Sequence, residues 1–426
     1  MFRAVRVTPE WLIAQRWFRS KQRPVAGISE LDRAPIGTGD AALSVLAVSY
    51  ADGGEDDQYL VPAVGDREPR DGEGVWAALI TAIADGAELR GIRGRFRCSR
   101  TDALGDLHGG ADLAERSLRV EQSNTSVVLG ETLILKLYRL LEPGLNPDIE
   151  VSRFLTDAGF GDTPPVAGAI RYETGDVVCM AAMLQEFVPS SGDAWASVRE
   201  ALCDSPDAAL ALVARIGELT ARMHAALASH PNDPAFPSRP ATTAETAGWR
   251  ASAEQQLSQA VTAVVGEAQK RLVVLAPAIT AQFADTFGSA TGGARVTRIH
   301  GDYHLGQLLA RADGGFSVVD FEGEPARLLA QRRQPSSPLR DIAGMLRSLD
   351  YAARTVGQGG GFDSDVWLHD ARGAFLKAYG GAKADQAGLL AAFELEKACY
   401  EVRYEANNRP DWLWLPLAAV ERLAAA

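Results

Sequence analysis

The sequence predicts an α+β fold of two lobes preceded by a smaller N-terminal domain, and two changes along its 426 residues indicate this division. Runs with the two-residue alternation of strands concentrate before residue 190, whereas apolar residues take the spacing of helices from Ala194 onward. Between these parts, the sequence Pro-Ser-Ser-Gly that begins at Pro189 has the composition of a hinge. We therefore expect an N-terminal domain over residues 1–100, a strand-rich lobe over 101–190 with the hinge near 185–190, and a helical lobe over 191–426.

The first hundred residues combine helix and strand patterns without recognisable chemistry. Thr8-Pro9-Glu10 marks a helix start with proline in the first turn, and this helix is expected to include Trp11, Trp17 and Phe18. Two strands and a second helix are predicted after it, over residues 43–50, 58–62 and 76–84.

The strand-rich lobe begins with a predicted β-meander of three strands, over residues 117–120, 126–129 and 132–138. A helix and two further strands follow, over residues 147–158, 167–173 and 177–187. In the third strand, alternation places Lys136 on the face opposite Leu133, Leu135 and Leu137. A lysine with such apolar neighbours needs an anion, and nucleotide phosphates would supply one. The alternative is an exposed lysine that protects an edge strand from aggregation.

The remaining sequence is predicted to be mostly helical. One buried stripe runs from Leu210 to Met223 on a helix over residues 207–228, in which His224 is expected to be structural. A long helical run over 244–287 is expected to break near Pro277. Two more helices are predicted, over residues 342–354 and 385–408.

Within this helical part, the stretch Arg298–Glu324 combines a loop, a tight turn and a strand. The loop holds His300-Gly301-Asp302, Gln307 follows five residues after the aspartate, and the strand ends at Asp320. Phosphoryl transfer from a nucleotide requires a carboxylate that orients the attacking hydroxyl, and carboxylate or amide oxygens that hold magnesium. Asp302, Gln307 and Asp320 supply these groups in that order.

Each of these residues also has a plainer interpretation. A lone aspartate in a loop is most often a turn former, as we expect for Asp313, and a buried histidine such as His300 is often only a core residue. A chance coincidence of His-Gly-Asp, an amide and a strand-terminal aspartate is much rarer, so the set favours catalysis.

This stretch resembles the catalytic and metal-binding loops of the aminoglycoside phosphotransferase-like kinases, which share the protein-kinase fold. Their usual pattern is His-Gly-Asp with an asparagine five residues after the aspartate, a position that Gln307 occupies here. Glutamine offers the same carbonyl oxygen on a longer arm. The resemblance implies a two-lobed protein-kinase-like fold, ATP and Mg²⁺ as cofactors, Asp302 as the catalytic residue, and Gln307 and Asp320 as metal ligands.

The same resemblance implies nucleotide-binding roles in the strand-rich lobe. Lys136 occupies the position that holds the α- and β-phosphates, and Glu150 the position of its helix partner. The loop that ends at Thr125 lies where protein kinases place a glycine-rich cover. Because it lacks glycine, its phosphate contacts are expected from backbone N–H groups and from Ser123, Asn124 and Thr125. Backbone groups are expected to read adenine in the hinge, at Gln185, Glu186, Phe187 and Val188.

The end of the last predicted helix carries a candidate acceptor site. Glu401, Glu405 and Asn408 follow at helical spacing, so two carboxylates and an amide share one face near Tyr404 and Trp412. Carbohydrate sites combine such groups with an aromatic platform. The alternative is a solvated surface in which the glutamates pair with a lysine or arginine of the same helix end, Lys397 or Arg409.

Two segments, Arg340–Ala353 and Tyr400–Trp412, resemble those of actinobacterial maltokinases and of the related glucosamine kinases, and the resemblance extends from Arg116 to Leu417. The first hundred residues match only loosely, as the cap domain that precedes the kinase lobes in that group. The implied acceptor contacts are Asp302, Tyr303, His304, Glu401, Tyr404, Glu405, Asn408 and Trp412.

Glucosamine is the acceptor that we favour, with glucosamine 6-phosphate as product. Asn407-Asn408 stands where we expect a maltokinase to have a bulkier or basic residue, and a cationic amine suits Glu401 and Glu405. One alternative is a maltokinase, which would convert maltose to maltose 1-phosphate. Another is a pseudokinase-like nucleotide-binding protein, which Gln307 and the missing glycines suggest.

Composition limits the partners. The formal net charge of −12 opposes nonspecific binding to nucleic acid or to an anionic membrane. The four cysteines are isolated, as expected for reduced thiols, and no uncharged apolar run reaches the length of a transmembrane helix. We therefore expect a monomeric, cytoplasmic enzyme that acts on a small-molecule sugar.

Overall fold

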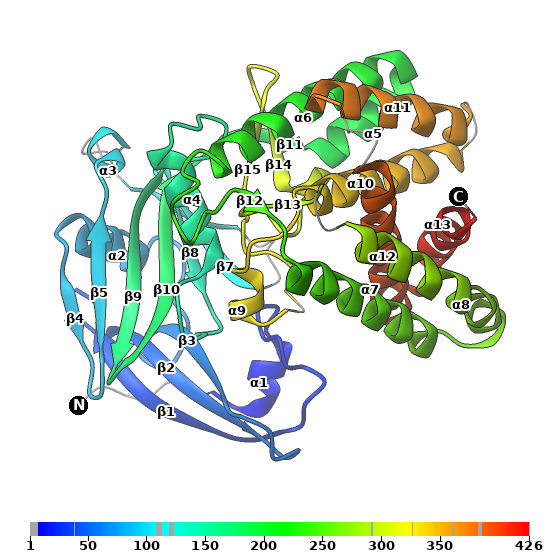
Figure 1. The fold of residues 1–426 in the computed structure, drawn as a ribbon. Helices are drawn as coiled ribbons and strands as arrows, with labels where there is room; N and C mark the ends of the chain where they lie inside the picture. Colours follow the sequence, from blue (N-terminus) through cyan, green and yellow to red (C-terminus); the bar gives the residue numbers. More distant parts are fainter. Residues whose placement is uncertain are drawn as a thin grey trace. The chain divides into compact units, whose positions relative to one another are not determined.

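The computed structural model describes residues 7–37, 39–107, 113–118, 123–290, 293–325, 327–359, 362–381 and 386–425 (Figure 1). The chain divides into two compact units, one of Met1–Asp157 with Thr163–Pro189 and the other of Ala158–Asp162 with Ser190–Ala426. The division after Pro189 falls in the segment that the sequence indicates as a hinge.

The N-terminal part of the first unit contains a three-stranded antiparallel sheet in the order β1-β2-β3. Its elements are α1 (Pro9–Ala14), β1 (Val25–Pro35), β2 (Ala41–Tyr50), β3 (Asp57–Val64) and α2 (Val75–Ala84). The Thr8 hydroxyl caps α1 by accepting the N–H of Trp11 at 3.2 Å. The sequence missed β1 because its buried residues, Asp32, Arg33 and Ala34, are consecutive and two of them are charged, so the strand shows no apolar alternation.

The first helix is shorter than expected. It ends at Ala14, so Trp17 and Phe18 lie beyond it, where their rings pack against Tyr59 with centroids 5.7 and 5.3 Å away. These rings form one hydrophobic core cluster on the β1-β2-β3 sheet together with Leu12 and Val48.

The second sheet of this unit has seven strands in the order β4-β5-β9-β10-β8-β7-β6. Its elements, with two helices between them, are β4 (Glu88–Arg90), β5 (Arg95–Arg100), α3 (Ala103–Leu107), β6 (Glu115–Leu118), β7 (Asn124–Leu129), β8 (Leu133–Tyr138), α4 (Pro147–Asp157), β9 (Val166–Thr174) and β10 (Val177–Glu186). Strands β4 and β5 come from residues that the sequence placed in the N-terminal domain. The predicted alternation is confirmed in β8, where Leu133, Leu135 and Leu137 are buried and Lys136 is partly exposed.

Arg139 joins the two sheets of the first unit. Its guanidinium donates to the Thr125 hydroxyl at 2.8 Å and to the carbonyl of Leu60 at 3.2 Å, and pairs with Glu68 at 2.7 Å. It also lies 4.8 Å from the centre of the Trp17 ring. The N-terminal sheet is therefore fixed to the strands that carry Lys136.

Helices dominate the second unit, as the sequence predicts. They are α5 (Ala194–Asp204), α6 (Pro206–Leu227), α7 (Thr243–Ala263), α8 (Gly266–Ser289), α9 (Leu329–Arg332), α10 (Leu339–Gly357), α11 (Ser364–Tyr379), α12 (Ala387–Asn408) and α13 (Trp414–Ala424), with the short turns η1 (Leu305–Gln307) and η3 (Pro410–Trp412). Two small sheets accompany them, β11-β14-β15 and β12-β13, formed by β11 (Ser190–Asp193), β12 (Arg239–Pro240), β13 (Arg295–Val296), β14 (Leu308–Arg311) and β15 (Phe316–Val318).

Helix α12 is central to this unit. It packs against α7, α8, α10 and α13, and Figure 1 shows it between α10 and α7. Its buried residues include the apolar Leu390, Phe393 and Val402 but also Glu394 and Glu396. A helix with charged groups in such a position must have partners for them, and those partners organise the site described below.

The predicted break at Pro277 is wrong. The helical run is interrupted at Val264 and Val265, and Pro277 lies inside α8, which continues because Leu272, Ile279 and Phe283 are buried. By length and composition, α8 is the one helix among the described residues that could cross a membrane, a property that it shares with core helices of globular proteins.

Candidate active site

The loop that carries His300, Gly301 and Asp302 is anchored by a carboxylate that the sequence did not single out. Asp341, in the first turn of α10, accepts the backbone N–H of His300 at 2.8 Å and that of Gly301 at 2.9 Å. It also lies 3.0 Å from Nε2 of His224, which confirms a structural role for that histidine. Burial would raise the pKa of Asp341, but His224, His300 and the N–H of Gly301 hold it below its ordinary value.

Replacing Asp341 by alanine should release this loop. Two backbone N–H groups, one of them buried, and His224 would lose their acceptor, so we expect the free energy of unfolding to fall by about 3 to 5 kcal/mol. Because the pKa of Asp341 is lowered on folding, its contribution is complete above the ordinary value of 3.8 and is lost as the pH falls from there through the lower pKa of the folded state.

Urea denaturation of the wild type and of Asp341→Ala tests this prediction at neutral pH and at a pH below the ordinary aspartate pKa. The difference between the two proteins should narrow at the lower pH. A difference that is the same at both values would show that the carboxylate charge does not hold the loop.

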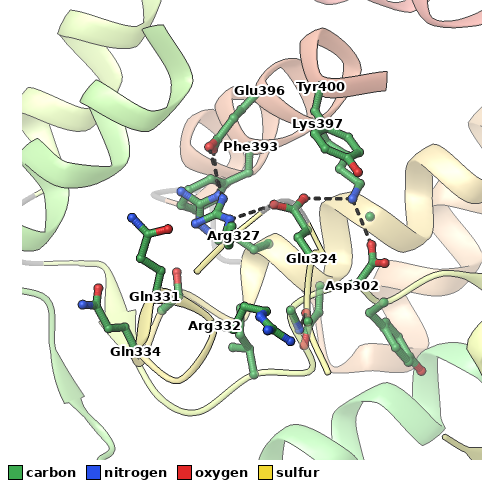
Figure 2. A pocket seen from close by; sticks show the side chains of 18 of the residues that line it. Asp302, Glu324, Arg327, Gln331, Arg332, Gln334, Phe393, Glu396, Lys397 and Tyr400 are labelled. Carbon is green, nitrogen blue, oxygen red and sulfur yellow. Dashed lines mark hydrogen bonds and ion pairs between the residues drawn. The ribbon is translucent and has the colours of Figure 1, made fainter. Parts of the chain in front are cut away.

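Asp302 ends a chain of alternating charges within the second unit (Figure 2). Its Oδ1 lies 3.1 Å from Nζ of Lys397, which lies 3.0 Å from Oε1 of Glu324. The chain continues through Arg327, 2.7 Å from Glu324, to Glu396 at 3.9 Å. The ammonium of Lys397 therefore ties the loop of His300, Gly301 and Asp302 to the segment that follows Asp320.

Electrostatics keep this chain charged. Burial would lower the pKa of Lys397, but Glu324 and Asp302 raise it well above its ordinary value. Burial would likewise raise the pKa of Glu324, yet Lys397 and Arg327 lower it to about 2. The sequence named Lys397 only as a partner for the glutamates of α12, because its actual partners are more than seventy residues away in the chain.

Gln307 and Asp320 come together as expected from their places on the hairpin. Nε2 of Gln307 donates to Oδ2 of Asp320 at 3.3 Å, and the N–H of Val319 donates to the carbonyl of Gln307 at 3.0 Å. Asp320 has a φ of 66°, a left-handed conformation that is costly for a residue with a side chain and often found at functional sites. A carboxylate and an amide oxygen are hard donors of the kind that Mg²⁺ prefers.

His300 and Tyr303 are structural. The ring of His300 is 1% exposed, packs 4.7 Å from Phe321, and places Nε2 3.0 Å from the carbonyl of Val319. The Tyr303 hydroxyl is 3.0 Å from that of Thr220, in the core, so the expected contact of this side chain with an acceptor is wrong.

In the first unit, Lys136 pairs with Asp148 rather than with the expected Glu150. Nζ of Lys136 lies 2.8 Å from Oδ2 of Asp148, and the Tyr138 hydroxyl donates to the same oxygen at 3.1 Å. Glu150 follows two residues later, about 200° around α4, and lines a separate cavity with Arg153. The sequence placed the partner on the correct helix but on the wrong face.

The proposed phosphate cover also differs from expectation. Asn124 and Thr125 belong to β7 rather than to a loop, and Gln122 lies outside the described residues. Thr125 is opposite Leu137, on the face of the sheet away from Lys136, and its hydroxyl accepts from Arg139. Asn124, opposite Tyr138, shares the face of Lys136, and its amide donates to the Ser123 hydroxyl at 3.3 Å.

Some backbone N–H groups of the hinge segment already donate hydrogen bonds within the first unit. The N–H of Glu186 donates to the carbonyl of Pro165 at 3.1 Å, and that of Phe187 to Thr132 at 2.8 Å. The Gln185 amide donates to the carbonyl of Pro164 at 3.2 Å. These contacts fix the segment within the first unit and engage two of the N–H groups that the sequence assigned to adenine.

A cavity of about 420 Å³ in the second unit is lined by Asp302 and by one face of α12. Glu401 and Glu405 both line it, as predicted, but neither is an open carboxylate. Arg347 donates to Glu401 at 2.9 and 2.7 Å, and Arg409 to Glu405 at 2.9 and 2.6 Å. Burial raises the pKa of Glu401 even though Arg347 opposes this shift.

Aromatic side chains and His304 complete the cavity wall. Tyr404 and Trp412 line it, and Trp412 stacks on Tyr351 with centroids 6.3 Å apart. The N–H of Gly306 donates to Nδ1 of His304 at 3.1 Å, and burial lowers the pKa of this imidazole, so the neutral ring carries its proton on Nε2. Asn408 does not line the cavity: it is exposed, and its amide donates to the carbonyl of Tyr404 at 2.8 Å.

Comparison with known proteins identifies the family of the chain. Residues 115–350 match the phosphotransferase enzyme family, over a range that includes Lys136, Asp302, Gln307 and Asp320. The chain belongs to this family. Residues 11–91 match the maltokinase N-terminal cap domain, so the expectation of a cap in front of a protein-kinase-like fold is confirmed.

Relatives of this phosphotransferase include two proteins named glucosamine kinase. One, from Streptacidiphilus jiangxiensis, is 32% identical over 84% of each chain, and another, from Mycolicibacterium smegmatis, is 29% identical over 72% of this chain and 79% of its own. A solved glucosamine kinase has a TM-score of 0.75 at 27% identity, covering 99% of this chain and 98% of its own. A glucosamine kinase solved with glucosamine, ADP and inorganic phosphate has a TM-score of 0.71 at 28% identity, over 98% and 100%.

Proposed function

We propose that this phosphotransferase transfers the γ-phosphoryl group of ATP to the 6-hydroxyl group of D-glucosamine, which gives glucosamine 6-phosphate and ADP. The observation that carries the proposal is the position of Asp302, whose carboxylate lies on a cavity that also presents aromatic rings and the glutamates of α12. The relatives named glucosamine kinase support this acceptor, and the relative solved with ADP supports the nucleotide.

The residues divide the chemistry between them. Asp302 would orient the acceptor hydroxyl and take its proton while the oxygen bonds to the γ-phosphorus and the bond to the leaving ADP oxygen breaks. Magnesium, when bound, would neutralise charge on the phosphates, and Gln307 and Asp320 would hold it. Nε2–H of His304 would donate a hydrogen bond to the acceptor.

In the first unit, the ammonium of Lys136, positioned by Asp148, would contact the α- and β-phosphates. Of the residues expected to cover the phosphates, Asn124 lies on the same face of the sheet as Lys136 and donates to Ser123. The side chains of Asn124 and Ser123 would therefore contact phosphate. Since the N–H groups of Glu186 and Phe187 are engaged, the N–H of Val188 would donate to the adenine edge.

An acceptor panel tests the function. ADP release should be measured with glucosamine, glucose, maltose and an aminoglycoside, at equal concentrations and with saturating MgATP. We expect kcat/KM to be highest for glucosamine. Maltose is the second candidate because residues 11–91 match a maltokinase cap domain, and a preference for maltose would replace the proposal. Nucleotide binding without turnover of any acceptor would support the pseudokinase alternative.

Exchanges at Gln307 test the metal assignment. Gln307→Asn keeps a carbonyl oxygen on a shorter arm, so we expect activity to persist with a modest increase in the magnesium concentration required. Gln307→Leu keeps the volume but removes the oxygen, and should raise the magnesium requirement by about tenfold or more. Magnesium titrations of both variants give the comparison, and equal requirements would show that the amide only packs against Asp320.

A further inference from the structure

The acceptor cavity is lined by four carboxylates, and three of them are in ion pairs with cations of the protein. These pairs are Asp302 with Lys397 at 3.1 Å, Glu401 with Arg347 at 2.7 Å, and Glu405 with Arg409 at 2.6 Å. An ion pair has little attraction left for a ligand cation, because the attractive and repulsive charges lie side by side. The two glutamates that the sequence assigned to a substrate amine are therefore poor candidates for it.

Asp193 is the fourth carboxylate. It ends β11 and caps α5, where its Oδ1 accepts the N–H of Ala196 at 2.8 Å. Within the part of the chain that the structure describes, no lysine, arginine or histidine forms an ion pair with it. One oxygen is thus used by a neutral donor, and the full negative charge of the group is not balanced by a protein cation.

The position of Asp193 is fixed relative to the catalytic loop. Its backbone pairs with Leu309 in β14, immediately after the turn η1. A Cβ on Gly306 would lie 4.0 Å from Oδ2 of Asp193 and 3.0 Å from the ring of His304. The absence of a side chain at this residue therefore keeps the space between Asp193 and His304 open, four residues after Asp302.

The charge of the lining also favours a cation. Lys397, Arg347 and Arg409 pair with three of the four carboxylates, which leaves one negative charge in excess, and the ring of His304 is neutral. Trp195, two residues after Asp193, lines the same cavity, and the guanidinium of Arg199 lies 5.7 Å from the centre of its ring. A ligand with hydroxyl groups and one ammonium group matches this combination.

We propose that Asp193 and Trp195 form an ammonium subsite, in which Asp193 binds the amine of a 2-amino sugar while its 6-hydroxyl group lies at Asp302. This inference rests on the proposed function and assigns acceptor selectivity to β11 and α5 instead of α12. The charge-assisted hydrogen bond from the ammonium group replaces water on Oδ2, and Oδ1 continues to cap α5.

The test is Asp193→Asn, which keeps the shape and the helix cap but removes the charge. Initial rates with glucosamine and with glucose should be measured at saturating MgATP. We expect KM for glucosamine to rise by about ten- to a hundredfold with kcat changed less than threefold, and KM for glucose to change little. Asp363→Asn is the matched control, because Asp363 also caps a helix through its side chain but lies outside the cavity.

The possible results distinguish a failure of the subsite assignment from a failure of the proposed function. If the wild type does not phosphorylate glucosamine, the proposed function fails. If the wild type does so and Asp193→Asn keeps the same selectivity for glucosamine over glucose, the function stands and the subsite is wrong. Loss of that selectivity in Glu401→Gln or Glu405→Gln, but not in Asp193→Asn, would return the amine to α12.

Discussion

Replacing Asp302 by asparagine is expected to lower kcat by a factor of about 10² to 10⁴ while the affinity for ATP changes little. Asparagine keeps an oxygen that can face Lys397 but is far too weak a base to take the proton of the acceptor. The loop that carries Asp302 should keep its place, because Asp341 holds the backbone at His300 and Gly301 rather than at Asp302. The assay is single-turnover phosphorylation of glucosamine, with calorimetry of MgATP binding alongside.

Retention of more than half of the wild-type kcat would contradict this role for Asp302. A variant that instead loses nucleotide affinity would show that the pair with Lys397 supports the nucleotide site. Thermal unfolding of the same variant controls for a general loss of structure, since Lys397 would still face Glu324 at its side.

Replacing Asp320 by alanine should abolish the magnesium dependence of nucleotide binding. The carboxylate is the charged member of the pair that would hold the ion, and an amide alone binds Mg²⁺ weakly. In the wild type, ATP with magnesium should raise the melting temperature more than ATP with a chelator, because ligand that binds only the folded state stabilises it. In Asp320→Ala the two conditions should give the same shift.

Asp313→Ala is the matched control for this experiment. Asp313 lies on the same hairpin but is exposed, and its side chain serves the turn by accepting the N–H of Gly315 at 2.8 Å. Its removal should leave the magnesium effect intact. An unchanged magnesium effect in Asp320→Ala itself would move the metal site elsewhere in the protein.

Local patterns in the sequence predicted much of the fold. The alternation around Lys136 gave the strand and its faces, and the apolar stripe of residues 207–228 gave α6 almost to its ends. The prediction failed where packing overrides the local pattern. Pro277 sits inside α8 because buried side chains on both sides of it hold the helix together, and β1 carries too few buried residues to show an alternation.

The sequence predicted those site contacts that local structure, a hairpin or a helix, brings together. Gln307 and Asp320 meet because they lie on one hairpin, and Glu401 and Glu405 share a face because they are four residues apart. The pair of Glu405 with Arg409, four residues later, is the local ion pair that the sequence offered as the alternative. The cation that pairs with Glu401 is not local. Arg347, which neutralises Glu401, is 54 residues away, so spacing along α12 could not reveal that the carboxylate is engaged.

Apart from Asp148, which lies two residues from the expected Glu150, the contacts that the sequence missed act across long separations. Asp341 holds a loop about forty residues earlier, and Lys397 reaches Asp302 from α12. Asp193 is not recognisable as a site residue from the sequence, because it follows a hinge-like run and has the position of an ordinary helix cap, which it also is. A helix cap beside the catalytic loop gains a second use only through the three-dimensional arrangement.

The position of the phosphate on the product tests the central claim most directly. After reaction of the wild type with MgATP and glucosamine, a two-dimensional phosphorus–proton correlation spectrum identifies the carbon that carries the new phosphate. The account predicts coupling of the phosphorus to the two protons on C6. Coupling to the anomeric proton, or a phosphorus spectrum with no sugar phosphate, would contradict it.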